Sequence, residues 1–261
     1  MRYGSAGYVL TALADFLMPR ECLVCGRELL VHEKHICTPC LEEMPLTYFW
    51  KDADNPMGKK FNALVQRENE QSGGAVYEQY SYAAALFHYR TGTGYEELTK
   101  ALKYHSDMAA GRFFAAMLGR RIASSPLFCD VSAVVPVPLH WTRSLSRGYN
   151  QAEVIAREVA SCIGVPVYPR LLRRNRRTRT QTHMSGEDKV SNVKGAFTAD
   201  TKALSGIAGR GGHVLLVDDV FTSGSTLLSC RKAVCSALDA LGVKHGDVRI
   251  SVATLGYVGG L

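Results

Sequence analysis

The sequence predicts an α/β protein in which a mostly parallel sheet is flanked by helices, with a small four-cysteine zinc module at the N-terminus. Continuous apolar runs at 131–137 and 214–217 are typical of strands that are buried on both faces, as in parallel sheets. Helical periodicity follows the second run, up to a stop at Gly242. Two Cys-x-x-Cys pairs near the N-terminus predict the separate module.

The length of 261 residues suits one large domain, or one ordinary domain with a small module. We expect an N-terminal helix with the cysteine module at 1–48, a linker at 49–75 and the main domain at 76–261. A hydrophobic content of 46% is enough for a packed core. The net charge of +7 favours anionic partners such as phosphates, diphosphates or nucleic acid, with a generally basic surface as the alternative.

The apolar run at residues 9–17 is too short to span a membrane, and Asp15 interrupts it. A single Arg precedes the run, and no small-residue cleavage pattern follows it. We therefore expect a short amphipathic helix, no insertion into a membrane and a cytoplasmic location.

The first cysteine pair is Cys22 and Cys25, and the second is Cys37 and Cys40, with eleven residues between the pairs. Two such pairs can bring four thiolates to one tetrahedral ion, which favours a closed, structural zinc site. Its role would be in folding or in docking a partner. A redox disulfide pair, an iron–sulfur site, or substitution of a cysteine by His32 or His35 are the alternatives. The other four cysteines are interpreted as core or helix-surface thiols: Cys129, Cys162, Cys230 and Cys235.

The segment at 49–75 has poor periodicity, but its aromatic residues suggest that it packs on a domain. A strand is expected at Tyr80–Tyr89, and helices at 96–102 and 108–122. Lys103 follows the first of these helices. It is either a ligand-binding cation or an ordinary charge at a helix end.

The strand at 131–137 ends in Pro136 and Pro138, so the chain must leave the sheet there. Ligands of parallel sheets bind just beyond the carboxyl ends of the strands. Arg143 and Arg147 in the following loop can present two guanidinium groups to a diphosphate, or they belong to a solvated helix start. A helix at 152–162 and a short strand at 165–167 come next.

The segment from Leu171 to Phe197 has little apolar periodicity and is rich in arginine, including Arg179. Compact domains rarely contain so long an irregular segment unless it is a binding loop. It suits closure over a polyanion or contact with a nucleic-acid backbone, and a solvated basic loop is the alternative. A last strand is expected at 248–255.

The stretch from Val214 to Thr226 carries the main functional signal. A buried strand leads to Asp218 and Asp219, then to a turn of hydroxyl residues and glycine, then to a helix. Amides of such a turn and the helix N-terminus favour an anion. Two acids beside an anion site suit a ribose 5-phosphate, whereas a plain capping turn is the alternative.

This stretch resembles the phosphoribosyl-diphosphate (PRPP) signature of type I phosphoribosyltransferases. The whole chain is similar to the ComF family of phosphoribosyltransferase-like competence proteins, which also carry a zinc-ribbon-like module. The matching motifs are the four cysteines, Leu102-Lys103-Tyr104, Pro136–His140, Arg147–Gln151, Thr180-Gln181, Asn192-Val193, Gly195–Phe197 and the acidic stretch. Lys189, where the family often has Arg, and Ser223, where it often has Thr, depart from the pattern.

The resemblance implies a type I phosphoribosyltransferase-like fold that binds PRPP with Mg²⁺. It assigns Asp218 and Asp219 to the ribose and the metal, and Arg179 to a loop that closes over the site. The 5-phosphate would be held by Thr222, Ser223, Gly224, Ser225 and Thr226. The diphosphate would be held by Lys103, Arg143 and Arg147.

Two functions follow from these patterns. One is a phosphoribosyltransferase of unknown acceptor, because no segment of the sequence is recognisable as a nucleobase site. The other is a non-enzymatic or regulatory protein of DNA uptake that keeps the phosphoribosyl pocket and contacts single-stranded DNA or an uptake partner. The arginine-rich segment has no aromatic residues to stack on bases, so it would contact mainly the backbone.

Overall fold

A parallel sheet forms the centre of the protein. The structure is a computed structural model that describes residues 15–16, 18–71, 78–104, 107–139, 148–175, 196–209 and 212–259, without the side chains of 103 and 104. Its strand order is β1-β6-β5-β2, and all three neighbouring pairs are parallel. The strands are β1 (Ala83–His88), β2 (Val131–Pro136), β5 (His213–Phe221) and β6 (Arg249–Tyr257). A separate antiparallel pair consists of β3 (Leu172–Arg174) and β4 (Phe197–Ala199). The expected α/β class with a parallel sheet is confirmed.

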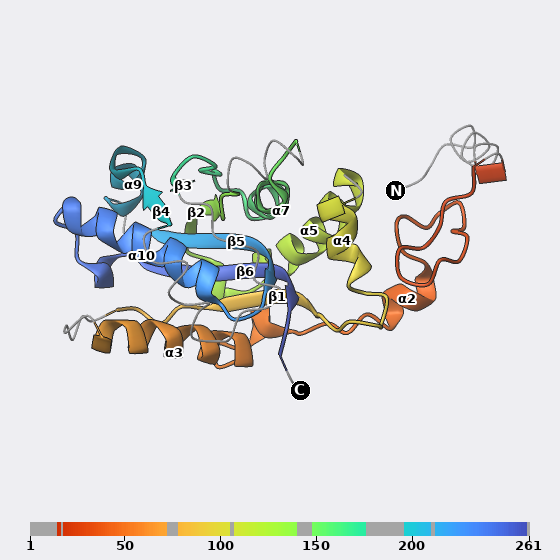
Figure 1. The fold of residues 1–261 in the computed structure, drawn as a ribbon, viewed down its shortest axis with the longest axis horizontal. Coiled ribbons are helices and arrows are strands. Elements are labelled where there is room, and N and C mark those ends of the chain that lie inside the picture. The colour runs from red at the N-terminus through yellow and green to blue at the C-terminus, as the bar shows by residue number, and fades with distance from the viewer. Residues whose placement is uncertain are drawn as a thin grey trace.

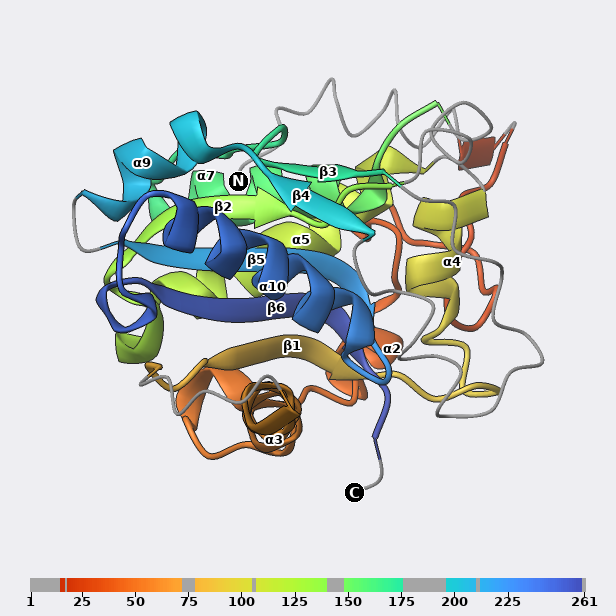
Figure 2. The same ribbon diagram turned by 60° about the vertical axis from the view of Figure 1, so that its left-hand side comes forward.

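Helices cover both faces of the sheet. The described α-helices are α2 (Thr38–Glu42), α3 (Pro56–Gln71), α4 (Glu97–Tyr104), α5 (Met108–Ala123), α7 (Gln151–Ile163), α9 (Thr201–Ala208) and α10 (Ser225–Ala240). Short 3-10 helices lie at η1 (Phe49–Lys51), η2 (Pro126–Phe128) and η3 (His245–Asp247). Figure 2 shows α10 in front of the strands and α5 behind them. Helices α3, α9 and α10 therefore share one core with the sheet, and α4, α5 and α7 share another.

Both outer edges of the sheet are covered by short pieces of chain. Beside β1, the His88 amide donates to the Pro45 carbonyl over 2.8 Å, and Leu46 bridges Phe87. Beside β2, Val167 forms a parallel bridge with Val134. The expected short strand at 165–167 is thus a single bridge. Covered edges leave few unpaired backbone groups that could recruit another strand.

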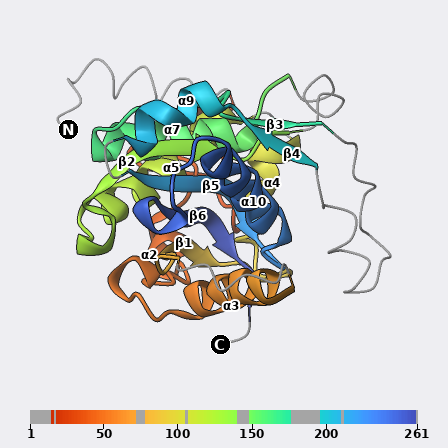
Figure 3. The same ribbon diagram turned by 90° about the vertical axis from the view of Figure 1, so that its left-hand side faces the viewer.

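The segment at 49–71, expected to be part of a linker, contains η1 and helix α3. Figure 3 places α3 below β1, close to α10. Met57, Phe61 and Val65 recur every four residues and are buried in the core beneath α10. The interpretation as a connector missed this helix, because charged and amide residues separate its few apolar positions. The Asn55-Pro56 pair marks the helix start.

Asn55 shows why α3 begins where it does. Its side-chain oxygen accepts a bond from the Gly58 amide over 2.9 Å, which caps the first turn. Its side-chain nitrogen donates to the carbonyls of Phe49, Asp52 and Ala83. Because this buried amide is fully bonded, it ties α3 to η1 and to the first residue of β1.

Candidate functional site

The acidic pair lies at the carboxyl end of β5, which is one of the two central strands. The sequence predicts a strand end at Val217, but β5 continues to Phe221, and Asp218 and Asp219 lie within it. The ladder with β6 persists here, since Asp218 pairs with Thr254 and Phe221 with Tyr257. The Asp219 amide donates to Oδ1 of Asp218 over 2.9 Å. Both carboxylates are half-buried. They are therefore held by a rigid strand instead of a loop.

A three-residue turn, Thr222–Gly224, joins β5 to α10. Gly224 has a φ of +81°, in the left-handed region that favours glycine. A Cβ at this position would lie 2.7 Å from Cζ of Phe221 and 2.9 Å from Cδ1 of Leu64 in α3. The Ser223 and Ser225 hydroxyls lie 2.9 Å apart. Glycine therefore lets the turn pack tightly against both the strand and α3.

The start of α10 differs from the starts of three other helices. α5, α7 and α9 are each capped by a side chain that accepts a bond from a first-turn amide: Asp107, Asn150 and Asp200. α10 follows Gly224 and has no side-chain cap. The Ser225 amide reaches the Ser223 hydroxyl over a long 3.4 Å. The first turn of α10 thus offers amide donors and the positive end of the helix dipole to an anion.

Lys60 is a cation at this turn that sequence reasoning missed. Its Nζ donates to the Thr222 carbonyl over 2.7 Å and lies 5.7 Å from the centre of the Phe221 ring. It comes from α3, in the segment that the sequence predicts to be a linker. Lysine is common on an exposed helix face, so nothing in its sequence context indicates this contact.

Arg174, the last residue of β3, lies on the same side of the sheet as α10. Its guanidinium group sits 5.2 Å from the centre of the Phe197 ring in β4. Burial raises the pKa of Cys230 in α10 well above its usual range; the Asp218 charge acts in the same direction, and Arg174 opposes it. Both charges therefore lie near one buried thiol beneath the acidic pair.

The described residues on either side of the loop after β2 lie beside the acidic pair, as expected. The Val137 amide donates to the Val217 carbonyl over 2.8 Å, just before Asp218. Asn150, the cap of α7, donates to the Val137 carbonyl over 3.0 Å and so joins the start of α7 to the end of β2. The Tyr149 hydroxyl donates to the Leu102 carbonyl at the end of α4. These contacts gather the ends of β2, α4 and β5 at one edge of the sheet.

Several predicted site residues cannot be placed. Arg143, Arg147 and Arg179 lie outside the described residues. Lys103 lies near the end of α4, but its side chain is outside the described part. Their assignment to the diphosphate and to loop closure stays a prediction.

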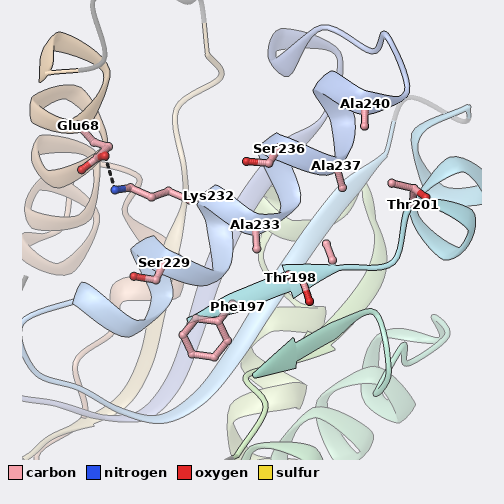
Figure 4. A pocket seen from close by; sticks show the side chains of 11 residues that line it. Glu68, Phe197, Thr198, Thr201, Ser229, Lys232, Ala233, Ser236, Ala237 and Ala240 are labelled. Carbon is pink, nitrogen blue, oxygen red and sulfur yellow. Dashed lines mark ion pairs between the residues drawn. The ribbon is translucent and has the colours of Figure 1, made fainter. Parts of the chain in front are cut away.

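The cavity at the turn is small, about 20 Å³, and is lined by Asp218, Val220 and residues 221–227. A larger hollow of about 610 Å³ lies between α10 and β4. Figure 4 shows that small side chains of α10 line much of it, and that Lys232 pairs with Glu68 of α3. Because these two charges pair with each other, the hollow offers little to an anion. The turn is the better candidate despite its size.

The four cysteines of the N-terminal module converge, as predicted. The Sγ atoms of Cys22, Cys25, Cys37 and Cys40 all lie within 4.8 Å of one another. Those of Cys25 and Cys37 are 3.8 Å apart. Zn–S bonds of about 2.3 Å in a tetrahedron place sulfur atoms about 3.8 Å apart. The four thiols therefore fit one structural zinc ion, and neither His32 nor His35 belongs to this group in the described part of the chain.

Backbone donors and Glu33 organise the module around the cysteines. Burial disfavours the Cys22 thiolate, but amides of Cys37, Cys25 and Val24 outweigh it and lower the pKa of Cys22 to about 7. Glu33 accepts bonds from the amides of Thr38 (2.6 Å) and Leu30 (2.9 Å), which lower its pKa to about 2. The carboxylate thus fixes the loop between the two pairs.

The module also packs on the main domain, beside α4 and α5 (Figure 1). The Tyr95 hydroxyl donates to the Cys40 carbonyl over 2.8 Å. His35 lies 5.7 Å from the Phe113 ring of α5 and 3.7 Å from the Asp107 carboxylate. A Cβ at Gly94 would collide with the Val24 carbonyl oxygen, so the two backbones approach closely there. The module is joined to the core of the sheet instead of standing apart from it.

Among the described residues, no helix has the length and apolar character needed to cross a membrane.

Comparison with known proteins finds relatives that match part or most of the chain. The chain is 36% identical to Competence protein F of Haemophilus influenzae over 116 residues, which are 44% of this chain and 48% of that protein. It is 32% identical to DNA utilization protein YhgH of Salmonella typhi over 111 residues, 42% of this chain and 45% of that protein. It is 25% identical to Competence protein ComFC of Bacillus subtilis over 214 residues, 81% of this chain and 77% of that protein. No family model matches the chain.

The match to the first two relatives therefore spans about half of their length. The fold and the site define an α/β protein with a parallel sheet, an acidic strand end and a four-cysteine module. In sequence, the chain is thus similar to proteins named for competence and DNA utilization, which agrees with its resemblance to the ComF family.

Proposed function

We propose that the protein binds PRPP, or a related ribose 5-phosphate ligand, at the carboxyl end of β5. The observation that supports this proposal is the order of features along one continuous stretch of chain: two carboxylates at the end of β5, a glycine turn, and α10 without a side-chain cap. The turn and the first amides of α10 suit the 5-phosphate. Asp218 and Asp219 suit the ribose hydroxyls, which donate hydrogen bonds to carboxylates.

Mg²⁺ would screen the charge of the diphosphate when bound, and Asp218 and Asp219 supply the carboxylate oxygens that it prefers. With an acceptor in place, the bond from ribose C1 to diphosphate breaks as the bond from C1 to the acceptor forms. The contribution of this chain is to hold the ribose and its phosphate in a fixed orientation. By resemblance, Lys103, Arg143 and Arg147 would stabilise the departing diphosphate, and Arg179 would belong to the loop that excludes water.

The names of the relatives refer to competence and DNA utilization. We propose the same setting for this chain, with a cytoplasmic location.

The test is calorimetric titration of PRPP with Mg²⁺ into the full-length protein and into Asp218→Asn/Asp219→Asn. We expect binding to the wild type and its loss in the double variant. Asp247→Asn removes an exposed acid near the start of β6, at the other edge of the sheet, and should bind like the wild type. Circular dichroism checks that each variant is folded. Absence of binding to the wild type, or equal binding by the double variant, would overturn the proposal.

A second candidate function is contact with single-stranded DNA, favoured by the names of the relatives and by the net charge of +7. Fluorescence anisotropy with a labelled oligonucleotide tests it. Because contacts to phosphates release counterions, binding to a single strand should weaken about 300-fold or more between roughly 50 and 200 mM salt if at least six phosphates are contacted. Binding that is absent, or unchanged by salt, would remove this candidate.

A further inference from the structure

Three side chains with metal-binding atoms meet at the edge of the sheet opposite the turn. Glu78 precedes β1, Cys235 lies in the C-terminal half of α10, and His245 begins η3 before β6. One potential ligand atom of each lies within 4.8 Å of the other two. Cys235 is buried, and the side chains of Glu78 and His245 are 8% and 15% exposed. The sequence separates these residues widely, so their pattern does not resemble a metal motif.

The donor set and the spacing suit zinc. Thiolate, imidazole and carboxylate are the three ligand types that zinc takes in proteins. Oε1 of Glu78 lies 3.2 Å from Nδ1 of His245. With zinc bonds of about 2.0–2.2 Å to nitrogen and oxygen, a tetrahedral site places these two atoms about 3.3–3.5 Å apart. Very little movement would therefore bring both atoms onto one ion.

His245 has the surroundings of a metal-binding histidine. Its Nε2 lies 2.8 Å from Oδ1 of Asp239, and its Nδ1 faces Glu78. If Nε2 donates a hydrogen bond to Asp239, Nδ1 can present its lone pair on the side of Glu78, where one metal ion could bind both atoms. A carboxylate on the other ring nitrogen is the usual partner of a histidine that binds metal.

The Glu78 carboxylate, like the His245 ring, is held by a second partner. Arg231 of α10 pairs with its second oxygen, Oε2, and both side chains are 8% exposed. Such bonds commonly hold a carboxylate ligand in place. The charges also balance, because the Cys235 thiolate, Glu78 and Asp239 together match Arg231 and one divalent ion. Burial raises the pKa of Cys235 to about 11, so the thiol is protonated at neutral pH when no metal is bound.

We propose that Glu78, Cys235 and His245 form a second zinc site, distinct from the four-cysteine module, with water as the fourth ligand. Binding forms a Zn–S bond to Cys235 and releases the thiol proton to solvent. The ion fixes the C-terminal half of α10 to the chain that enters β1 and to the chain that enters β6. Its effect is to join three segments at the edge of the sheet away from the phosphate turn.

The first test counts zinc in the full-length protein after equilibration with buffered Zn²⁺ and removal of free metal. We expect two ions per chain in the wild type, and one in His245→Ala and in Cys235→Ser. Cys129→Ser removes an exposed cysteine outside both clusters and should keep two ions. One ion per chain in the wild type overturns the proposal, because the three residues then form only an ion-pair network. Two ions in both variants overturn the assignment to these residues.

A second measurement does not depend on how well the variants fold. Zinc is added, in weak buffer with a pH indicator, to wild-type protein that already holds one ion per chain. Uptake of the second ion should release at least one proton, from the Cys235 thiol. Uptake without any proton release would show that the ion does not bind a thiol, and would overturn the site.

Discussion

The amino edge of the parallel sheet, where its strands begin, and its carboxyl edge, where they end, are built in opposite ways. Both β5 and α10 extend from one of these edges to the other. At the amino edge, side chains bond to side chains. His213 is buried, with Nδ1 2.6 Å from Asp130 and Nε2 2.7 Å from Ser251, and Arg231 pairs with Glu78. At the carboxyl edge, Gly224 precedes α10 without a side-chain cap. The amino edge therefore pairs its charged side chains mainly with one another, whereas the carboxyl edge leaves main-chain donors for a ligand.

We call the amino edge, where side chains bond to one another, the closed edge, and we call the carboxyl edge the open edge. His213 illustrates the closed edge. Burial lowers its pKa by more than Asp130 raises it, so the ring stays neutral where an exposed histidine would begin to take up a proton. Side-chain pairing at the amino edge thus serves stability, including the stability that the proposed zinc ion would add, whereas the carboxyl edge serves binding of the proposed phosphoribosyl ligand. Variants at the two edges should therefore separate these two properties.

The largest expected effect is at the closed edge. Arg231→Met leaves the Glu78 carboxylate buried without its guanidinium partner, which should lower the free energy of unfolding by about 3–5 kcal/mol. Urea unfolding followed by circular dichroism, with a chelator present, measures the loss. PRPP binding by the folded variant should be unchanged.

Arg157→Met is the matched control, because Arg157 forms an exposed pair with Glu153 at 2.6 Å. Such a pair contributes about 0–1 kcal/mol. If the two variants lose equal stability, the network at the closed edge does not have the role given to it here.

The next effect is at the open edge. Gly224→Ala places a Cβ 2.7 Å from the Phe221 ring at a φ of +81°, which should cost about 1–3 kcal/mol and distort the turn. PRPP affinity should fall at least about tenfold, or 1.4 kcal/mol. Calorimetry and urea unfolding measure the two quantities.

Gly242→Ala tests whether backbone strain alone explains such a result. Gly242 lies just after α10 with a φ of +67°, and nothing lies within 4 Å of its added Cβ. It should lose stability through the same left-handed strain, with no change in PRPP affinity. A loss of affinity in both variants would show that the turn has no special role.

The sequence predicts features whose parts are close together along the chain. The four cysteines, the acidic pair and the glycine turn each lie within a short stretch, and the structure places each stretch as its pattern indicates. The end of β5 is less well predicted, because Asp218 and Asp219 are unfavourable in isolated strands but are held here by pairing with β6. Tertiary pairing overrides the local preference.

Contacts between distant segments were not predictable. Helix α3 shows few apolar residues, since only Met57, Phe61, Val65 and their immediate neighbours face the core. Glu78, Cys235 and His245 meet only because β1, α10 and β6 adjoin at one edge of the sheet. Side chains such as these carry no local pattern, and topology alone brings them together.

The smallest expected effect separates binding from stability most clearly. Lys60 is exposed and bonds to the Thr222 carbonyl over 2.7 Å, so Lys60→Met should change the free energy of unfolding by less than about 0.5 kcal/mol. Its charge lies beside the turn that we propose for the 5-phosphate. PRPP affinity should therefore fall about three- to tenfold, or roughly 0.7–1.4 kcal/mol, and less at high salt.

The neighbouring Lys59 instead pairs with Asp54 at 2.9 Å, so Lys59→Met should leave PRPP affinity unchanged. Equal affinities of the two variants would mean that the open edge attracts its ligand through main-chain amides alone, without help from α3.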